Sequence, residues 1–460
     1  MTIAEATPDF EADRNDRAFL GHPKGLGYLA FVEGCERFSY YSMQTLLVLY
    51  MVKYLLLPEN AAGVVGLSAL RDWYGGIDGQ PLASKIFGDY TSLVYLTPIA
   101  GGFIADRWLG RRTTLILGGI FMAVGHFLMA FEGAFLLALL ALIVGVGLFK
   151  GNIASQVGEL YGPNDLRRAM AFQIFYIAIN VSVIVAPLIS GTLGEKVGWH
   201  WGFGTAGVVM VAGLMLYIYA KPWLPAENRD LRVERAAAPK EPMTREDWTR
   251  VAALLILVPA LAIALLTNQE IFNAYLVWAD QHFQLTFFGT TLPTSYMITI
   301  DAAASFSMLV AVAAFYVWYG KRYKEPDELG KMIIGSFFTI AGGLCLFMAA
   351  ATQGGGKIGP FWPLMFHLFN SIGFAHILPV SLALFTKVAP KALNATVVGI
   401  YYLAFFGANK IVGEVGGWYS SMPTTSFWLF HVATAVVGLI AFVLFKLFLG
   451  KRLTGEAPSG

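Results

Sequence analysis

The chain has 460 residues, of which 57% are hydrophobic and only 13% are charged, and its mean hydropathy is +0.60. A soluble globular domain carries about 25% charged residues, so this composition excludes an ordinary soluble protein and indicates a polytopic membrane protein. The formal charge of +2 and the lack of a basic tract interleaved with aromatic residues argue against nucleic-acid binding. The stretch through Arg17 is polar, without the apolar core of a signal peptide.

Apolar stretches long enough to cross the hydrocarbon core of a bilayer recur about twelve times, which predicts an all-α fold. They lie near residues 28–52, 86–106, 113–132, 134–155, 171–191, 201–221, 250–275, 293–319, 331–351, 361–387, 394–419 and 425–448. Cys35 and Cys345 fall within these spans, so we expect neither a disulfide framework nor a metal site. No connection between spans is long enough to form a separate catalytic domain.

Arginine and lysine are concentrated in alternate connections, whereas the other connections have Lys196 and Lys357 nearly alone. By the positive-inside rule, both termini and the connection after the sixth span lie in the cytoplasm of a multi-pass cell-membrane protein. That connection contains four prolines and is typical of a flexible linker. The predicted organisation is a cytoplasmic N-terminal tail (1–26), an N-terminal six-helix bundle (27–222), a cytoplasmic linker (223–249), a C-terminal six-helix bundle (250–449) and a cytoplasmic tail (450–460). Transporters built from two such halves bind substrate near the midplane at their interface.

The first span contains three charged residues, which are rare in membrane helices and usually have a structural or functional role. Glu33, Glu36, Arg37 and Tyr40 are spaced i, i+3, i+4 and i+7, so they share one face of a helix. A charge at bilayer depth costs about 2.5–3.5 kcal/mol by insertion scales, so such residues usually face a protein interior or a watery cavity. A proton- or ion-coupled site is therefore the leading hypothesis, and an ion-paired cluster that only fixes helix packing is the alternative.

Lys150 in the fourth span is a second candidate for a buried charge. Its flanking glycines favour an interior position over a side chain that reaches the membrane interface. With Glu33, Glu36 and Arg37 it completes a nearly neutral group of two acids and two bases. One proton gained or lost changes the pairing within such a group, as a proton-coupled switch requires.

Several further polar residues lie in apolar spans and have two readings each. Asn180 either lines a pocket or makes an interhelical hydrogen bond, and Tyr95 either lines a pocket or packs. His376 either titrates or is a packing histidine. Lys410 and Glu414 are spaced i and i+4, which predicts a local ion pair.

The segment 101–112, which joins the second and third spans, has the frame Gly-Gly-Phe-Ile-Ala-Asp-Arg. Its glycines permit close approach of helices, and Asp106 can pair with neighbouring arginines at the cytoplasmic rim. This frame resembles the loop signature of the major facilitator superfamily.

Within that superfamily, almost all of residues 25–450 resembles the proton-coupled oligopeptide transporter (POT/PTR) family, as a divergent bacterial-type member. The most specific match is the first-span motif Glu-x-x-Glu-Arg-Phe-x-Tyr-Tyr, residues 33–41. Further matching segments are 105–112, 147–153, 175–180, 194–204, 278–280 and 386–390. The resemblance implies the major facilitator fold, with twelve transmembrane helices in two six-helix bundles.

The resemblance also implies a role for each matched residue. Those implied in proton coupling are Glu33, Glu36, Arg37 and Lys150, and the two bases would also hold a substrate carboxylate. Four residues of the first half are implied to line the substrate pocket: Tyr40, Tyr41, Tyr95 and Asn180.

The second half departs from the family pattern. The family glutamates of spans 7 and 10 fall on Gln269 and Phe374, and the family asparagine of span 8 falls on Asp301. In the family, the glutamates hold the ammonium group of a peptide through a strong charge-assisted contact. Asp301 is a candidate replacement. Glu270 is another candidate for the substrate site, although one residue turns about 100° around a helix and Glu270 is not assumed to substitute for its neighbour.

We therefore expect a symporter that imports di- or tripeptides, or peptide-like compounds carrying a carboxylate, by alternating access. Its partners would be the substrate, protons and the lipid bilayer, with the proton as coupling ion and no cofactor. The alternative is a proton-coupled transporter of a non-peptide organic anion or an N-terminally modified peptide. An intramembrane enzyme is not expected, because no His-Glu-x-x-His or Gly-x-Ser-x-Gly motif occurs. A further alternative is a nutrient-sensing receptor, which would bind the ligand without transporting it.

Overall fold

The structure is a computed structural model. The residues that it describes are 16–162, 165–225, 242–390 and 394–454. The predicted tails (1–26 and 450–460) and the predicted linker (223–249) lie partly outside these residues.

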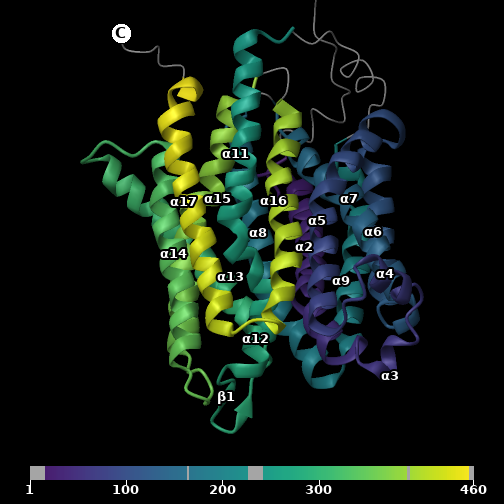
Figure 1. Cartoon of the computed structure of the whole chain (residues 1–460). Helices are drawn as coiled ribbons and strands as arrows, with labels where there is room; N and C mark the ends of the chain where they lie inside the picture. Colours follow the sequence, from purple (N-terminus) through teal and green to yellow (C-terminus); the bar gives the residue numbers. More distant parts are fainter. Residues whose placement is uncertain (1–15, 163–164, 226–241, 391–393, 455–460) are drawn as a thin grey trace, which may run out of the picture. The chain divides into compact units, whose positions relative to one another are not determined.

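Twelve long helices make up most of the described chain (Figure 1). In chain order they are α2 (Lys24–Tyr50), α5 (Gly79–Ile104), α6 (Arg111–Leu128), α7 (Phe135–Glu159), α8 (Arg167–Ala186), α9 (Trp199–Tyr219), α11 (Arg245–Gln269), α13 (Tyr296–Gly320), α14 (Glu328–Thr352), α15 (Phe361–Val388), α16 (Asn394–Gly417) and α17 (Thr424–Thr454). Eight of them, among the described residues, are long and apolar enough to cross a membrane: α7, α8, α9, α11, α13, α14, α15 and α17. The prediction of an all-α protein with twelve long helices is confirmed.

Short elements connect or extend these helices. Single helical turns of 3₁₀ or π type cover Met51–Leu55, Ala105–Leu109, Glu132–Ala134, Pro187–Gly191, Leu193–Val197, Lys221–Trp223, Glu270–Phe272 and Trp418–Ser420. The remaining short helices are α3 (Pro58–Ala61), α4 (Leu67–Trp73) and α12 (Ala274–His282). Two antiparallel strands, β1 (Thr286–Phe287) and β2 (Thr290–Thr291), form a small hairpin in which Thr286 pairs with Thr291.

The helices form two compact units. Unit 1 comprises the described residues of Met1–Leu46, Asn60–Leu67 and Leu96–Pro239. Unit 2 comprises those of Leu47–Glu59, Ser68–Tyr95 and Lys240–Gly460. The end of α2 and most of α5 therefore pack with the helices of unit 2. The predicted bundle boundaries follow the order of the chain and stay predictions.

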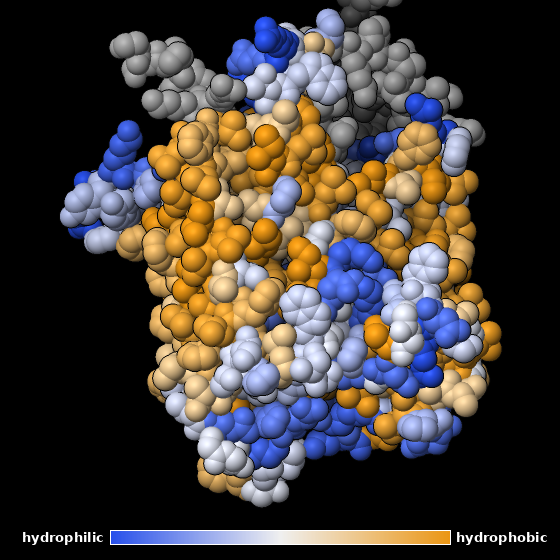
Figure 2. Space-filling view, viewed as in Figure 1, coloured by the Kyte–Doolittle hydropathy of each residue, from blue (hydrophilic) through white to orange (hydrophobic). Residues whose placement is uncertain are grey.

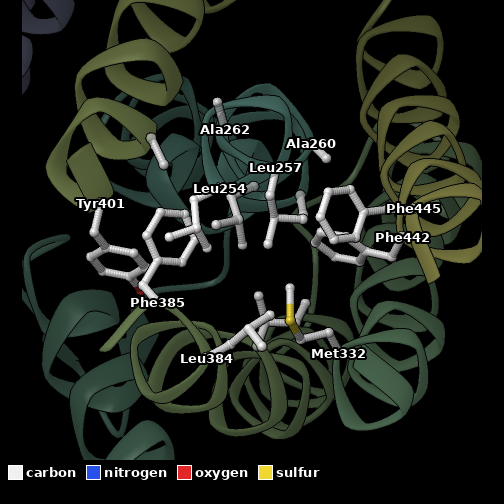
Figure 3. Close-up of a cluster of buried hydrophobic side chains, with 14 of the residues drawn as sticks. Leu254, Leu257, Ala260, Ala262, Met332, Leu384, Phe385, Tyr401, Phe442 and Phe445 are labelled. Atoms are coloured by element: carbon white, nitrogen blue, oxygen red, sulfur yellow. The ribbon is translucent and has the colours of Figure 1, made fainter. Parts of the chain in front are cut away.

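The core of unit 2 lies among α11, α14, α15, α16 and α17. Figure 3 shows Leu254 and Leu257 of α11 pointing toward Met332 of α14, with Phe442 and Phe445 of α17 beside them. On the outside, the surface over α14 and α17 is mostly apolar, with hydrophilic residues gathered near the helix ends (Figure 2). Apolar side chains both inside and outside the helices are what a unit surrounded by lipid requires.

Glycine allows a very close helix contact in unit 1. A Cβ atom built on Gly101 of α5 would lie 2.0 Å from the backbone oxygen of Gly147 of α7. The adjacent Gly102 has open space at the same place. Small residues at helix interfaces are a common packing device in membranes. The close helix approach predicted for this glycine pair therefore occurs at Gly101.

We expect Gly101→Ala to lower the thermal unfolding midpoint of the purified protein, and Gly102→Ala to leave it unchanged or slightly raised. Overpacking typically costs about 1–3 kcal/mol, and alanine in place of a helical glycine recovers up to about 1 kcal/mol. At Gly101 the obstacle is backbone, which cannot move aside as a side chain would. Intrinsic fluorescence during heating measures both variants, and equal midpoints would contradict this account of the helix contact.

Candidate functional site

The charged residues of α2 form one buried cluster in unit 1. Arg37 Nε lies 2.7 Å from Glu33 Oε1 and 2.9 Å from Glu36 Oε2. The side chains of Glu33, Glu36 and Arg37 are 3%, 0% and 8% exposed. Glu33 and Arg37 meet because residues four apart are neighbours on a helix surface, as the spacing predicts. One guanidinium therefore serves two carboxylates, and the three residues carry a net negative charge when both acids are ionised.

A lysine and two tyrosines continue this face of α2. Lys150 of α7 places its Nζ 5.6 Å from the centre of the Tyr40 ring, and the Tyr40 and Tyr41 rings meet edge to face at 5.1 Å. A cation at this distance from an aromatic face is attracted by the ring quadrupole. Lys150 thus lies beside Tyr40, three residues after Arg37 in α2, and its charge brings the two acids and two bases to formal neutrality.

The neighbouring helices of unit 1 hold α2 in this orientation. Ser39 of α2 is hydrogen-bonded to His126 Nε2 of α6, and Ser42 donates a hydrogen bond to Ser190, 2.8 Å away. A Cβ atom on Gly213 of α9 would lie 2.7 Å from Cβ of Cys35, so α9 also approaches closely. Sequence reasoning missed His126, although a histidine in an apolar span is a visible signal.

Asn180 and Tyr95 make contacts of different kinds. Asn180 Nδ2 donates to the backbone oxygen of Tyr176, 2.8 Å away in the same helix, so this hydrogen bond is local. Tyr95 belongs to unit 2, where its half-buried ring stacks on Phe405 of α16 at 4.7 Å. Tyr95 therefore packs against a neighbouring helix, as one of its two interpretations predicts. The pocket roles of Tyr95 and Asn180 stay predictions.

The seventh span is broken in unit 2. α11 ends at Gln269, a 3₁₀ turn follows, and α12 starts at Ala274. Glu270 is fully buried at this break, where its Oε1 accepts a hydrogen bond from the Ala274 backbone at 3.1 Å and its Oε2 lies 3.5 Å from His431 Nε2 of α17. Asn273 donates to the backbone oxygen of Val412 at 3.1 Å. The Glu270 side chain therefore points into the interior of unit 2, and its predicted role in the substrate site stays untested.

The two residues at the family glutamate positions are neutral. Gln269 is buried, and its Oε1 accepts a hydrogen bond from Asn409 Nδ2 at 3.4 Å. Phe374 of α15 is half-buried. Neither side chain offers a negative charge to a substrate ammonium group.

Asp301, by contrast, is a carboxylate with a partner. Its Oδ1 lies 2.9 Å from His367 Nδ1 of α15, and His367 Nε2 lies 2.8 Å from the hydroxyl of Tyr275 of α12. The Asp301 side chain is 11% exposed, and that of His367 is 1% exposed. Sequence reasoning required a partner for a charge at this depth and did not identify His367. The described residues contain no group of three or more histidine, cysteine or acidic side chains arranged to hold a metal ion.

The predicted local pair of Lys410 and Glu414 is wrong. Each side chain instead forms an ion pair with α5: Lys410 with Asp89, and Glu414 with Lys85. The Tyr74 hydroxyl also donates a hydrogen bond to Asp89, and burial together with this bond raises the pKa of the phenol.

The close approach of α5 and α16 explains this outcome. A Cβ atom on Gly88 of α5 would lie 2.4 Å from the Cα atom of Gly413 of α16. Charged side chains on either side of this glycine contact therefore reach across to the other helix. A contact between segments so far apart in the chain is invisible to an i, i+4 rule.

The chain is similar to known transporters along most of its length. Residues 82–413 match the model of the Major Facilitator Superfamily. "Peptide transporter YePEPT" of Yersinia enterocolitica is 28% identical, over 87% of this chain and 89% of that protein. A "Di-/tripeptide transporter" of Lactococcus lactis subsp. cremoris is 26% identical, over 94% of this chain and 96% of that protein. A crystal structure of a peptide transporter, POT, in complex with alafosfalin is 26% identical, with a TM-score of 0.83 over 98% of this chain and 99% of that one.

Proposed function

Because the chain belongs to the Major Facilitator Superfamily, and within it to the proton-coupled oligopeptide transporter (POT/PTR) family, we propose that it is a proton-coupled symporter that imports di- or tripeptides or peptide-like compounds. Membership makes the chain a multi-pass membrane transporter rather than an enzyme. The peptide transporters of Yersinia and Lactococcus support the substrate class. The single observation that carries proton coupling is the buried cluster in which Arg37 contacts both Glu33 and Glu36.

In this cluster, protonation of a glutamate makes the positive charge of a base available to the substrate. With both acids ionised, Arg37 is engaged by Glu33 and Glu36. Protonation of one acid removes its charge and weakens its attraction for the guanidinium. Arg37 or Lys150 then has positive charge available for a substrate carboxylate, a charge-assisted contact. Loss of the proton restores the original pairing and displaces the substrate, so the two ligands travel together through alternating access.

The proposal includes the setting of the protein. We place it in the cell membrane with both termini in the cytoplasm, because basic residues are concentrated in alternate connections. The proton is the coupling ion, and no other cofactor is required by the residues of the cluster.

A second candidate function rests on the neutral side chains of Gln269 and Phe374. Without those carboxylates the transporter favours a non-peptide organic anion or an N-terminally modified peptide, since nothing there holds an ammonium group. Arg37 and Lys150 would serve the carboxylate of either substrate. The two candidates therefore share the carboxylate site and differ in whether the substrate carries an ammonium group.

Uptake of radiolabelled dialanine into proteoliposomes tests the proposal. We expect an alkaline interior to drive accumulation above the external concentration, and a protonophore to abolish it. Accumulation that is equal with and without the pH gradient would contradict proton coupling. If N-acetyl-dialanine competes with dialanine at equal concentration, the second candidate is favoured, whereas competition by free dipeptides alone supports the first.

A further inference from the structure

We propose that Asp301 is a second proton-binding residue, located in unit 2 and held in position by His367 and Tyr275. This inference rests on the proposed function and adds to it a site separate from the acids of α2. The three residues come from α13, α15 and α12 and form a continuous chain of contacts, 2.9 Å from Asp301 Oδ1 to His367 Nδ1 and 2.8 Å from His367 Nε2 to the Tyr275 hydroxyl.

The direction of these hydrogen bonds follows from the chemistry of the groups. An ionised carboxylate can only accept, so Nδ1 of His367 carries the proton that it donates to Asp301. In the neutral imidazole, Nε2 is then an acceptor, and the Tyr275 hydroxyl donates to it. Tyr275 thereby fixes the tautomer and orientation of His367, and His367 fixes the carboxylate.

Only one end of this chain is open to the outside of the protein. The Asp301 side chain is 11% exposed, that of His367 is 1% exposed, and Tyr275 is fully buried. The aromatic rings that enclose Tyr275 are those of Trp278, Phe283, Phe366 and Trp428. A proton therefore reaches the chain through the exposed part of Asp301. Its binding forms one O–H bond and takes the net charge of the three residues from negative to neutral.

Several other ionisable groups of unit 2 have partners of their own. On α15, His376 Nδ1 lies 2.8 Å from the backbone oxygen of Ile372. Asp280 of α12 binds Lys53, with 2.7 Å between Oδ1 and Nζ. His431 of α17 faces Glu270 at 3.5 Å, and both of those side chains are fully buried. Cys345 of α14 is a buried thiol. Asp301 is thus the acid of this group that combines a fixed hydrogen-bond donor with residual exposure.

The Glu270–His431 pair offers a matched control. It is also an acid–imidazole pair of unit 2, but neither side chain has any exposed surface. Its contact is also longer, 3.5 Å against the 2.9 Å between Asp301 and His367. Loss of a buried acid–imidazole contact is common to variants at both sites, whereas loss of a proton site is expected only at Asp301.

The first measurement is the limiting accumulation ratio of dialanine in proteoliposomes, with the membrane potential held at zero and a gradient of one pH unit. We expect Asp301→Asn to lower the ratio about tenfold, because one pH unit contributes a factor of ten for each coupled proton. His431→Gln is expected to leave the ratio unchanged. We also expect His367→Phe to keep the ratio and to change the pH dependence of uptake, because the carboxylate loses its fixed hydrogen-bond donor.

A second measurement does not depend on transport. Infrared difference spectra between acid and alkaline pH report protonated carboxyl groups, and we expect a carboxylic-acid band of the wild type to be absent from Asp301→Asn and retained in His431→Gln. Identical spectra for the wild type and Asp301→Asn would overturn the proposal. If the wild type shows no gradient-driven uptake, the proposed function fails, while the infrared comparison still decides whether Asp301 binds a proton.

Discussion

Glu36→Gln is expected to lower gradient-driven accumulation of substrate strongly while leaving exchange of substrate across the membrane intact. Glu36 has no exposed surface, and its Oε2 lies 2.9 Å from Arg37 Nε. Glutamine preserves the shape of the side chain but neither binds nor releases a proton, so it imitates the protonated acid permanently. With a gradient of one pH unit, the ratio of internal to external dialanine should fall about tenfold, because one coupled proton is lost.

Exchange is measured as uptake of labelled dialanine into vesicles preloaded with the unlabelled compound and without a pH gradient. The control is Glu159→Gln at the end of α7, which removes an ion-paired carboxylate of the same unit outside the cluster. We expect Glu159→Gln to retain accumulation. Uphill accumulation by Glu36→Gln at the wild-type level would show that the proton binds elsewhere.

The fold and the α2 cluster were predictable because both depend on short-range patterns. Runs of apolar residues long enough to cross a bilayer predict the long helices, and predicted span 293–319 corresponds to α13 at Tyr296–Gly320. The contacts of Arg37 with Glu33 and Glu36 involve neighbours on one helix, which a spacing rule captures. Such features need no knowledge of how the helices pack.

Contacts between helices distant in the chain were not predictable in the same way. Asp301 and His367 are 66 residues apart, and Lys410 and Asp89 are 321 apart. The sequence shows that Asp301 needs a partner at its depth, but several histidines in apolar spans could have supplied it. The helix break after Gln269 was missed as well, since neither a proline nor a glycine marks it, although residues 268–270 and Asn273 are polar.

The two units together suggest how the chain tolerates neutral residues at Gln269 and Phe374. Carboxylates with charged or imidazole partners remain elsewhere in each unit: Glu33 and Glu36 with Arg37, and Asp301 with His367. A paired acid is less costly to bury than a lone one, because the partner compensates for lost hydration. Losing the family glutamates therefore need not remove proton binding from unit 2.

Arg37→Met should destabilise the protein more than any other single change in the α2 cluster. Methionine has similar length and fills the space, but it leaves two carboxylates with almost no exposed surface and without the guanidinium. Removal of one partner from a buried ion pair typically costs about 3–5 kcal/mol. We expect a clearly lower thermal unfolding midpoint and no transport, and a smaller loss for Arg37→Lys, which keeps the charge but not the planar fork.

The decisive comparison adds Glu36→Gln to Arg37→Met. Because the penalty comes from an uncompensated charge, removal of one charge should recover much of the lost stability, although Glu36→Gln alone is neutral or slightly destabilising. A double-mutant cycle of midpoints measures this coupling. If the two effects simply add, Arg37 stabilises the unit by packing rather than by charge. The formal neutrality of the cluster would then not be the property on which proton coupling depends.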